Sequence, residues 1–160
     1  MTITVTELTS TDPFADRFGE SLPCGLRQSA RGLTWPAFRD AYSLPADVTL
    51  ESLTCRPRPG GAVEVTVTLT ADGARTTATG RGTGPISAAT DLLYQSGLDV
   101  EAVEFHQIHI AEGVATFIRS VSATRDTAAR WSFAIAPDPG QSAVRALVAG
   151  AAMHRRPAHA

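Results

Sequence analysis

The chain has 160 residues, of which 43% are hydrophobic, and this length suits one domain with a sizeable core and a small appendage. Its formal net charge is −2, and every one of the 14 basic residues is arginine, which excludes Schiff-base chemistry and a P-loop lysine. The arginines are scattered rather than gathered in a basic stripe, so nucleic-acid binding is not expected.

Residues 1–46 are interrupted often by Pro, Ser and Gly and predict an N-terminal arm or linker-like segment. Within it we expect a short strand over residues 2–8, a short helix over 22–30 and a better helix over 34–42. Thr34 is the expected N-cap of the last helix, and Pro36 falls in its first turn, where the missing N–H costs little. The arm is therefore expected to be mainly helical.

A three-strand, one-helix pattern begins near residue 47. A strand is expected over residues 48–55, and alternating apolar residues predict a second one, buried on one face, at Val63, Val65, Val67 and Leu69. Asp72-Gly73 is typical of a hairpin turn before a returning strand over 75–79. The period then becomes helical over 85–96, and Gly97 is placed to end that helix. Its expected apolar face is Ile86, Ala89, Thr90 and Leu93.

The same order recurs in the second half. Strands are expected over residues 101–110, 114–123 and 130–136, with Trp131, Phe133 and Ile135 on one face of the last. A helix over 139–154 follows, with Val144, Leu147, Val148 and Ala151 directed inward. Residues 47–160 therefore predict an α+β fold of two pseudo-symmetric βββα units, each with its helix packed on an antiparallel sheet.

Targeting and cysteine usage add further expectations. No apolar run reaches membrane-spanning length, and the first residues lack the basic and apolar blocks of a signal peptide, so we expect a cytoplasmic protein with no membrane partner. Cys24 and Cys55 are too few for a disulfide framework and share no metal-ligand spacing. Both are expected to be free thiols, with no metal and no cofactor.

Two segments carry a family resemblance. The run Gly80-Arg81-Gly82-Thr83-Gly84-Pro85 with its helix, and the strand and helix over 131–155, resemble the C-terminal regulatory domain of 2-isopropylmalate synthase and citramalate synthase. Residues 21–23 and 35–38 are more weakly similar to the linker that precedes it. In that family the doubled βββα domain dimerises and binds the end-product amino acid as a feedback inhibitor. The resemblance implies a homodimer, a small carboxylate-bearing ligand and, as an open possibility, a separate catalytic subunit.

The resemblance also implies ligand-binding residues. Gly82, Thr83 and Gly84 match the loop of the effector pocket, Ser87 matches a small residue of the first helical turn, and Phe105 matches a pocket aromatic. Glycines let backbone N–H groups approach a ligand, and a helix N-terminus suits a carboxylate. The alternative is a tight strand-to-helix turn without a ligand. The family's loop Asn is Thr83 here and its Tyr is Phe105, so leucine itself is not implied as the ligand.

Other functions stay open at this stage. The sequence has no counterpart of the family's catalytic barrel and H-x-H metal motif, so we expect no acetyl-CoA condensation. A small isomerase, cyclase or dehydratase could instead use Glu104, His106 or Glu112 as acid or base, since Glu104 and His106 share a strand face while His109 lies on the other. A solvated strand face or an interface hydrogen bond explains the same pair. The third alternative is a purely structural dimerisation module.

Overall fold

The computed structural model describes residues 12–122 and 128–155. The chain divides into two compact units, residues 1–41 and 42–160. The strand expected over residues 2–8 lies outside the described residues, and the boundary expected at residue 47 stays a prediction.

The first unit contains three short helices, α1 (Pro13–Phe18), α2 (Cys24–Ser29) and α3 (Trp35–Tyr42), the last of which ends at the unit boundary. The Asp12 carboxylate caps α1 by accepting from the backbone N–H groups of Phe14 at 3.0 Å and Ala15 at 2.9 Å. The Thr34 hydroxyl accepts from the N–H of Ala37 at 3.3 Å, which confirms the predicted cap of α3. Side-chain caps satisfy the donors that a helix start leaves open.

An aromatic cluster joins α1 and α3. The ring of Phe18 lies 4.6 Å from that of Phe14 and meets Trp35 edge to face at 5.3 Å, and Trp35 stacks on Phe38 at 5.7 Å. The Arg17 guanidinium lies over the rings of Phe18 and Trp35. Offset ring pairs and a cation over a ring face are both attractive geometries, so a unit this small gains its core from a few large side chains.

The second unit begins with sheet A, an antiparallel meander of β1 (Val48–Pro57), β2 (Val63–Ala71) and β3 (Ala74–Gly82), with a short 3-10 turn, η2 (Pro59–Gly61), between the first two strands. Asp72 and Gly73 form the predicted hairpin turn, with φ angles of 53° and 76°. One face of the sheet carries the alternating apolar residues and the other is polar.

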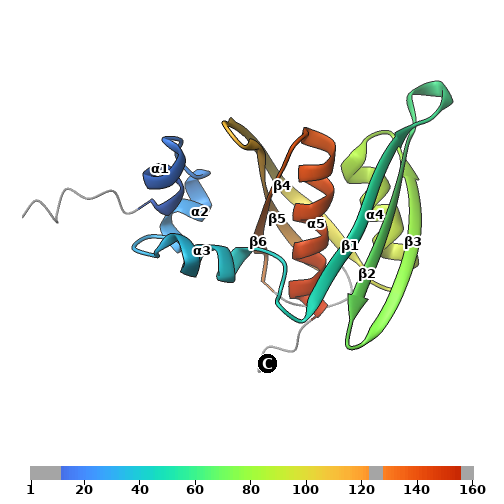
Figure 1. Cartoon of the computed structure of the whole chain (residues 1–160), viewed down its shortest axis with the longest axis horizontal. Helices are drawn as coiled ribbons and strands as arrows, with labels where there is room; N and C mark the ends of the chain where they lie inside the picture. The colour runs from blue at the N-terminus through green and yellow to red at the C-terminus, as the bar shows by residue number, and fades with distance from the viewer. Residues whose placement is uncertain (1–11, 123–127, 156–160) are drawn as a thin grey trace, which may run out of the picture. The chain divides into compact units, whose positions relative to one another are not determined.

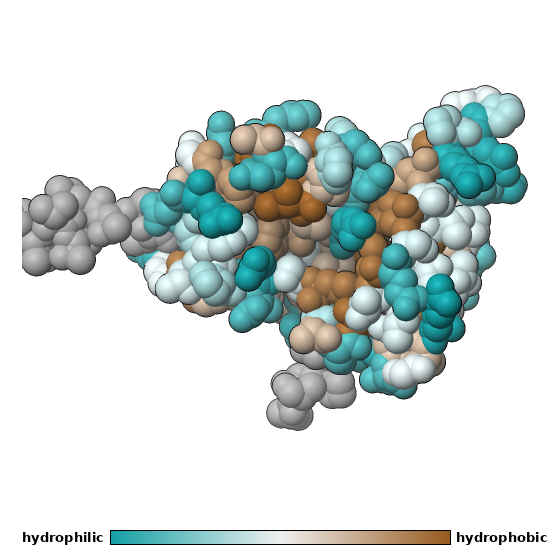
Figure 2. Space-filling view, in the orientation of Figure 1, coloured by the Kyte–Doolittle hydropathy of each residue, from teal (hydrophilic) through white to brown (hydrophobic). Residues whose placement is uncertain are grey.

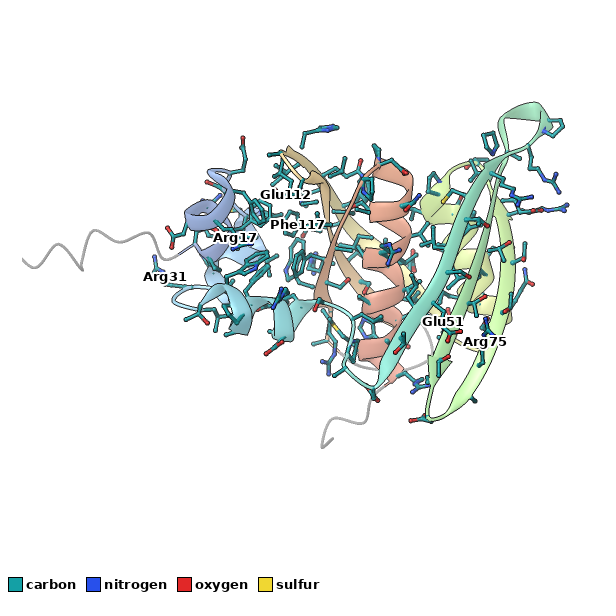
Figure 3. The ribbon with its side chains drawn as sticks, in the orientation of Figure 1. Arg17, Arg31, Glu51, Arg75, Glu112 and Phe117 are labelled. Atoms are coloured by element: carbon teal, nitrogen blue, oxygen red, sulfur yellow. The ribbon has the colours of Figure 1, made fainter. Side chains whose placement is uncertain are left out.

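The polar face of sheet A is a regular array of hydroxyls and ion pairs. Cross-strand threonines pair through their hydroxyls, as at Thr66 and Thr79, 2.9 Å apart. Arg75 pairs with Glu51 at 2.7 Å, and Figure 3 shows the two side chains directed toward each other. Figure 2 shows the surface around the β1–β2 connection as hydrophilic. This face is therefore built for contact with water.

The helix α4 (Pro85–Gln95) follows sheet A, and then the order repeats. Sheet B contains β4 (Val100–Ile110), β5 (Gly113–Ser122) and β6 (Arg130–Ala136), again in the order of the chain and antiparallel, and α5 (Pro139–Arg155) closes the unit. The structure thus has two three-stranded sheets, each followed by a helix, after an N-terminal segment of three helices. This confirms the predicted α+β class and the doubled βββα arrangement.

The core lies around α5, which packs on β5 and β6 and also contacts β1 and α4 (Figure 1). The predicted inward residues Val144, Leu147, Val148 and Ala151 are buried, and so are most of the others along the helix. A helix buried on nearly all sides is typical of one enclosed by other elements. Among the described residues, no helix has the length and apolarity that crossing a bilayer needs.

The face of α4 differs from the prediction. The buried residues are Ala88, Ala89, Leu92 and Leu93, while Ile86 and Thr90 are half-buried. Two adjacent lines of side chains along the helix, Ala88 with Leu92 and Ala89 with Leu93, are buried because α4 packs on β3 and β2 and also touches α5 and β4. The predicted face was therefore placed too far to one side, since it assumed contact with a single sheet.

Candidate functional site

The predicted ligand-binding residues lie mostly at the junction of β3 and α4. Gly82 is the last residue of β3, Gly84 is the N-cap of α4 and Pro85 is its first helical residue. The Ser87 hydroxyl accepts from the N–H of Gly84 at 3.1 Å, and the Thr83 hydroxyl lies 3.5 Å away from it. Two small hydroxyl side chains therefore stand beside the start of the helix.

The glycines at this junction have different physical reasons. A Cβ at Gly82 would meet Ser87 Oγ at 2.2 Å, and one at Gly80 would meet the carbonyl oxygen of Ala88 at 2.2 Å, so both allow α4 to lie directly on β3. At Gly84, neither close packing nor the backbone conformation requires a glycine. Its φ of −163° is ordinary extended backbone, and a Cβ there would meet nothing within 4 Å. The position that a side chain would take at Gly84 is therefore open.

The start of α4 also has backbone N–H groups without a partner inside the helix. Its first intrahelical hydrogen bond runs from the N–H of Ala88 to the oxygen of Gly84, at 3.0 Å. The N–H groups of Ile86 and Ser87 come before that bond, where no carbonyl of the helix can reach them. Such donors, together with the positive end of the helix dipole, attract an anion.

The start of α5 is the counterpart in the second half, and there the same position is filled. Asp138 stands before Pro139 as Gly84 stands before Pro85. The Asp138 carboxylate accepts from the N–H of Gln141 at 2.9 Å, so α5 has a carboxylate of its own at its first turn. Comparison of the two halves shows that α4 lacks the acidic side chain that α5 uses.

The two helix starts are neighbours. A Cβ at Gly140 would lie 3.5 Å from Cγ of Pro85, 3.4 Å from Oδ1 of Asp138 and 3.9 Å from Sγ of Cys55. Cys55 is a free, half-buried thiol. Burial, and then the nearby Asp138 charge, raise the pKa of its thiol, which makes it a poor nucleophile.

The strand β4 reaches the same region through Gln107. Its side-chain amide donates to the oxygen of Pro139 at 2.9 Å and to the Thr116 hydroxyl at 3.0 Å. Phe105 lies two residues earlier on the same face of β4 and is 47% exposed. Sequence reasoning missed both Gln107 and Asp138. The sequence signal for Asp138 is that Asp138-Pro139 occupies the same place in the second half as Gly84-Pro85 does in the first.

The acid–base candidates lie on the opposite face of β4. Glu104 and His106 share a face as predicted, with 3.3 Å between Oε2 and Nε2, and Arg119 donates to Glu104 at 2.8 Å. Hydrogen bonds from His106 and Arg119 lower the pKa of Glu104, which holds it as a paired carboxylate. Glu112 lies at the tip of the β4–β5 hairpin (Figure 3), beyond Ile110 at the end of β4, which is itself about 13 Å along the strand from His106. The acid–base hypothesis stays a prediction that this arrangement does not favour.

In residues 12–122 and 128–155, no group of three or more His, Cys, Asp and Glu side chains is placed to hold a metal ion.

The comparisons with known proteins agree with the arrangement of the two halves. The model of the LeuA allosteric (dimerisation) domain matches residues 36–154. The chain belongs to this family. The match covers both βββα units, including the β3–α4 junction and the start of α5. The family relationship therefore supports a regulatory dimerisation module.

Its curated relatives are 2-isopropylmalate synthases. The enzyme of Pseudarthrobacter chlorophenolicus is 28% identical over 125 residues, 71% of this chain and 21% of the relative. That of an Arthrobacter species is 32% identical over 87 residues, 49% of this chain and 15% of the relative. That of Renibacterium salmoninarum is 24% identical over 128 residues, 71% and 21% of the two chains. The chain thus spans about a fifth of the length of the Pseudarthrobacter and Renibacterium enzymes.

Proposed function

We propose that this chain is a regulatory module that binds a small carboxylate-bearing metabolite, an amino acid or a close relative, at the N-terminus of α4. The observation that carries the proposal is the difference between the two helix starts. The start of α5 holds the Asp138 carboxylate, whereas Gly84 leaves the start of α4 open. A ligand carboxylate placed there would accept hydrogen bonds from the N–H groups of Ile86 and Ser87.

The neighbourhood favours an amino acid over a simple acid. The Asp138 carboxylate and Pro85 both lie within 3.5 Å of one point, the position that a Cβ on Gly140 would take. A ligand whose carboxylate sits on α4 would therefore hold its ammonium group near an acidic side chain. Phe105 and the hydroxyls of Thr83 and Ser87 remain the proposed contacts for the rest of the ligand, with Gly82 and Gly84 bordering it.

The test is a titration calorimetry series on the whole chain with the branched-chain and other small amino acids and their matching 2-oxo acids. The wild-type chain is expected to give saturable heat with an amino acid and weaker heat with its 2-oxo partner. Gly84→Asp builds into α4 the cap that α5 already has, so it should abolish ligand heat. The same change should leave the fold intact and add about 0.5 kcal/mol to its stability.

The control is Gln95→Glu, which adds one carboxylate to the exposed far end of the same helix. Ligand heat should survive in this variant. The proposal fails if no amino acid or 2-oxo acid gives saturable heat, or if Gly84→Asp binds as the wild type does.

The module is also proposed to act as a homodimer. The family description names dimerisation, and the described part of the chain exposes the large apolar residues Val103 and Phe105 on β4, an edge strand of sheet B. Sedimentation equilibrium is expected to give twice the chain mass. A monomer at all accessible concentrations would contradict this part of the proposal. A separate catalytic subunit would be a further partner and needs its own search.

A further inference from the structure

A cavity of about 480 Å³ lies at the end of α4 far from Gly84. Its walls are the inner face of the β2–β3 hairpin, the last turns of α4 and α5, and the start of β4. All of these elements belong to the second compact unit. Because it lies at the opposite end of α4 from Gly84, the cavity is separate from the ligand site proposed above.

The sequence of β3 explains why the cavity exists. Its inner face consists of small residues, in order Ala74, Thr76, Ala78, Gly80 and Gly82. At the two glycines α4 lies in direct contact with the strand. Nearer the hairpin α4 ends at Gln95 while the strands continue, and the three small residues there line the cavity instead of filling it.

The walls of the cavity are apolar and its rim is polar. Leu69, Leu92, Leu98 and Val100 are among the apolar residues of its wall. A cavity of about 150 Å³ is enough for one benzene, and ligand pockets usually measure about 300–1,000 Å³ with few polar groups. The space thus suits a small hydrocarbon or aromatic body with a single polar head.

The charges around the rim favour a positive head. Asp72 and Asp99 carry negative charge there, and Arg155 is paired with Asp72 at 3.1 Å. Burial lowers the pKa of His154, against a weaker raising effect of its hydrogen bond to Ser120, and this favours the uncharged ring. The C-terminal ends of α4 and α5, which carry partial negative charge, both face the cavity.

We infer that this cavity is a second binding site, which takes a small apolar amine with its hydrocarbon body among the leucines and its ammonium group at the acidic rim. The proposal does not depend on the carboxylate site at Gly84. The two ends of α4 would then recognise opposite charges, an anion at its start and a cation at its end.

The experiment compares three probes that share one body: 4-phenylbutylamine, 4-phenylbutan-1-ol and 4-phenylbutyrate, titrated into the whole chain by calorimetry. The amine should bind most tightly and the carboxylate most weakly. Thr76→Trp places a large side chain in the cavity and should abolish amine heat. Thr77→Trp places the same side chain on the outer face of β3, so it should leave amine binding unchanged.

The charge preference has its own variant. Asp72 has a φ of 53°, which asparagine adopts readily in this turn, so Asp72→Asn removes the charge while keeping the hairpin. Asp72 is exposed, so water screens its charge and the effect should be small. The amine should bind about two- to fivefold more weakly, and 4-phenylbutyrate should bind more tightly than it does to the wild type. This variant tests the site even if Thr76→Trp does not fold.

Gly84→Asp separates the two sites, since it should leave amine binding as in the wild type. The inference is overturned if none of the three probes gives saturable heat, if the carboxylate binds as tightly as the amine, or if amine heat persists in a folded Thr76→Trp variant. It is also overturned if Gly84→Asp abolishes amine binding, because the amine would then occupy the first site.

Discussion

At the scale of single residues, the Gly80 to Gly84 motif combines two unrelated requirements. Gly80 and Gly82 are glycine because α4 leaves no room for a side chain, and Gly84 is glycine without any constraint from space or φ. A sequence pattern treats all three alike. The structure separates two glycines that let α4 pack on β3 from a third, Gly84, at which a side chain would fit.

Alanine substitutions measure this difference. Gly82→Ala and Gly80→Ala force atoms apart at the β3–α4 contact and should each lower the free energy of unfolding by about 1–3 kcal/mol. Gly80 should be the worse, because the two atoms nearest its added Cβ are backbone atoms, whereas the nearest at Gly82 is the Ser87 hydroxyl. Gly84→Ala should cost about 0.5 kcal/mol or less. Urea unfolding of the three variants checks the order. A large loss at Gly84, equal to the others, would contradict the account.

The ion pairs on the outer face of sheet A make a pH-dependent prediction. Glu64 accepts from Arg81 at 2.8 Å and from Arg58 at 3.1 Å, and these bonds, Arg81 first, lower its pKa. The unfolded glutamate titrates near pH 4.3, so the stability from these bonds is complete above about that pH and is lost as the pH falls through the lower folded pKa.

Glu64→Gln should therefore be less stable than the wild type at pH 7, and the gap should close under acid. Urea unfolding at pH 7, 5, 4 and 3 measures the gap, and Arg81→Gln should reproduce most of it because Arg81 is the stronger partner. A gap that stays constant from pH 7 to 3 would show that the ionised carboxylate is not the cause.

At the scale of elements, the chain order was readable from the sequence, but some placements were not. Alternating residues of β2 and the Asp72-Gly73 turn predicted sheet A directly. The helix α1 was missed, although Asp12-Pro13 is the pairing expected at an N-cap and first helical position. The burial of α5 on nearly all sides was also missed. Its other faces carry alanines and Gly150, and such small residues do not show from the sequence whether a helix face is buried or exposed.

The central position of α5 gives an element-scale prediction. Leu147 is fully buried in a core that includes residues from both sheets. Leu147→Ala should lower the free energy of unfolding by about 2–5 kcal/mol, whereas Arg145→Ala, on the less buried side of α5, should change it by about 0.5 kcal/mol or less.

Hydrogen exchange locates the loss. Because α5 contacts β1 as well as β5 and β6, the slowest amides of β2 and of β5 should lose protection together in Leu147→Ala. A loss confined to sheet B would mean that the two βββα halves unfold independently and that α5 does not join them.

At the scale of the whole molecule, duplication of one βββα pattern yields two helix starts side by side, one capped by the chain and one left open. The sequence predicted the doubled fold and, through its family resemblance, the junction at Gly82 to Ser87. It did not predict the contrast with Asp138 or the cavity at the other end of α4. The Asp138 contrast needed the two halves to be aligned at their Gly-Pro and Asp-Pro pairs, whereas the cavity depends on how the small residues of β3 face elements distant in the chain.

The most direct test is a crystal structure of the chain with the amino acid that gives the strongest calorimetric heat. The account predicts the ligand carboxylate at the start of α4, within hydrogen-bond distance of the N–H groups of Ile86 and Ser87 and in front of Gly84. A bound ligand whose carboxylate lies elsewhere, with the start of α4 unoccupied, would contradict it.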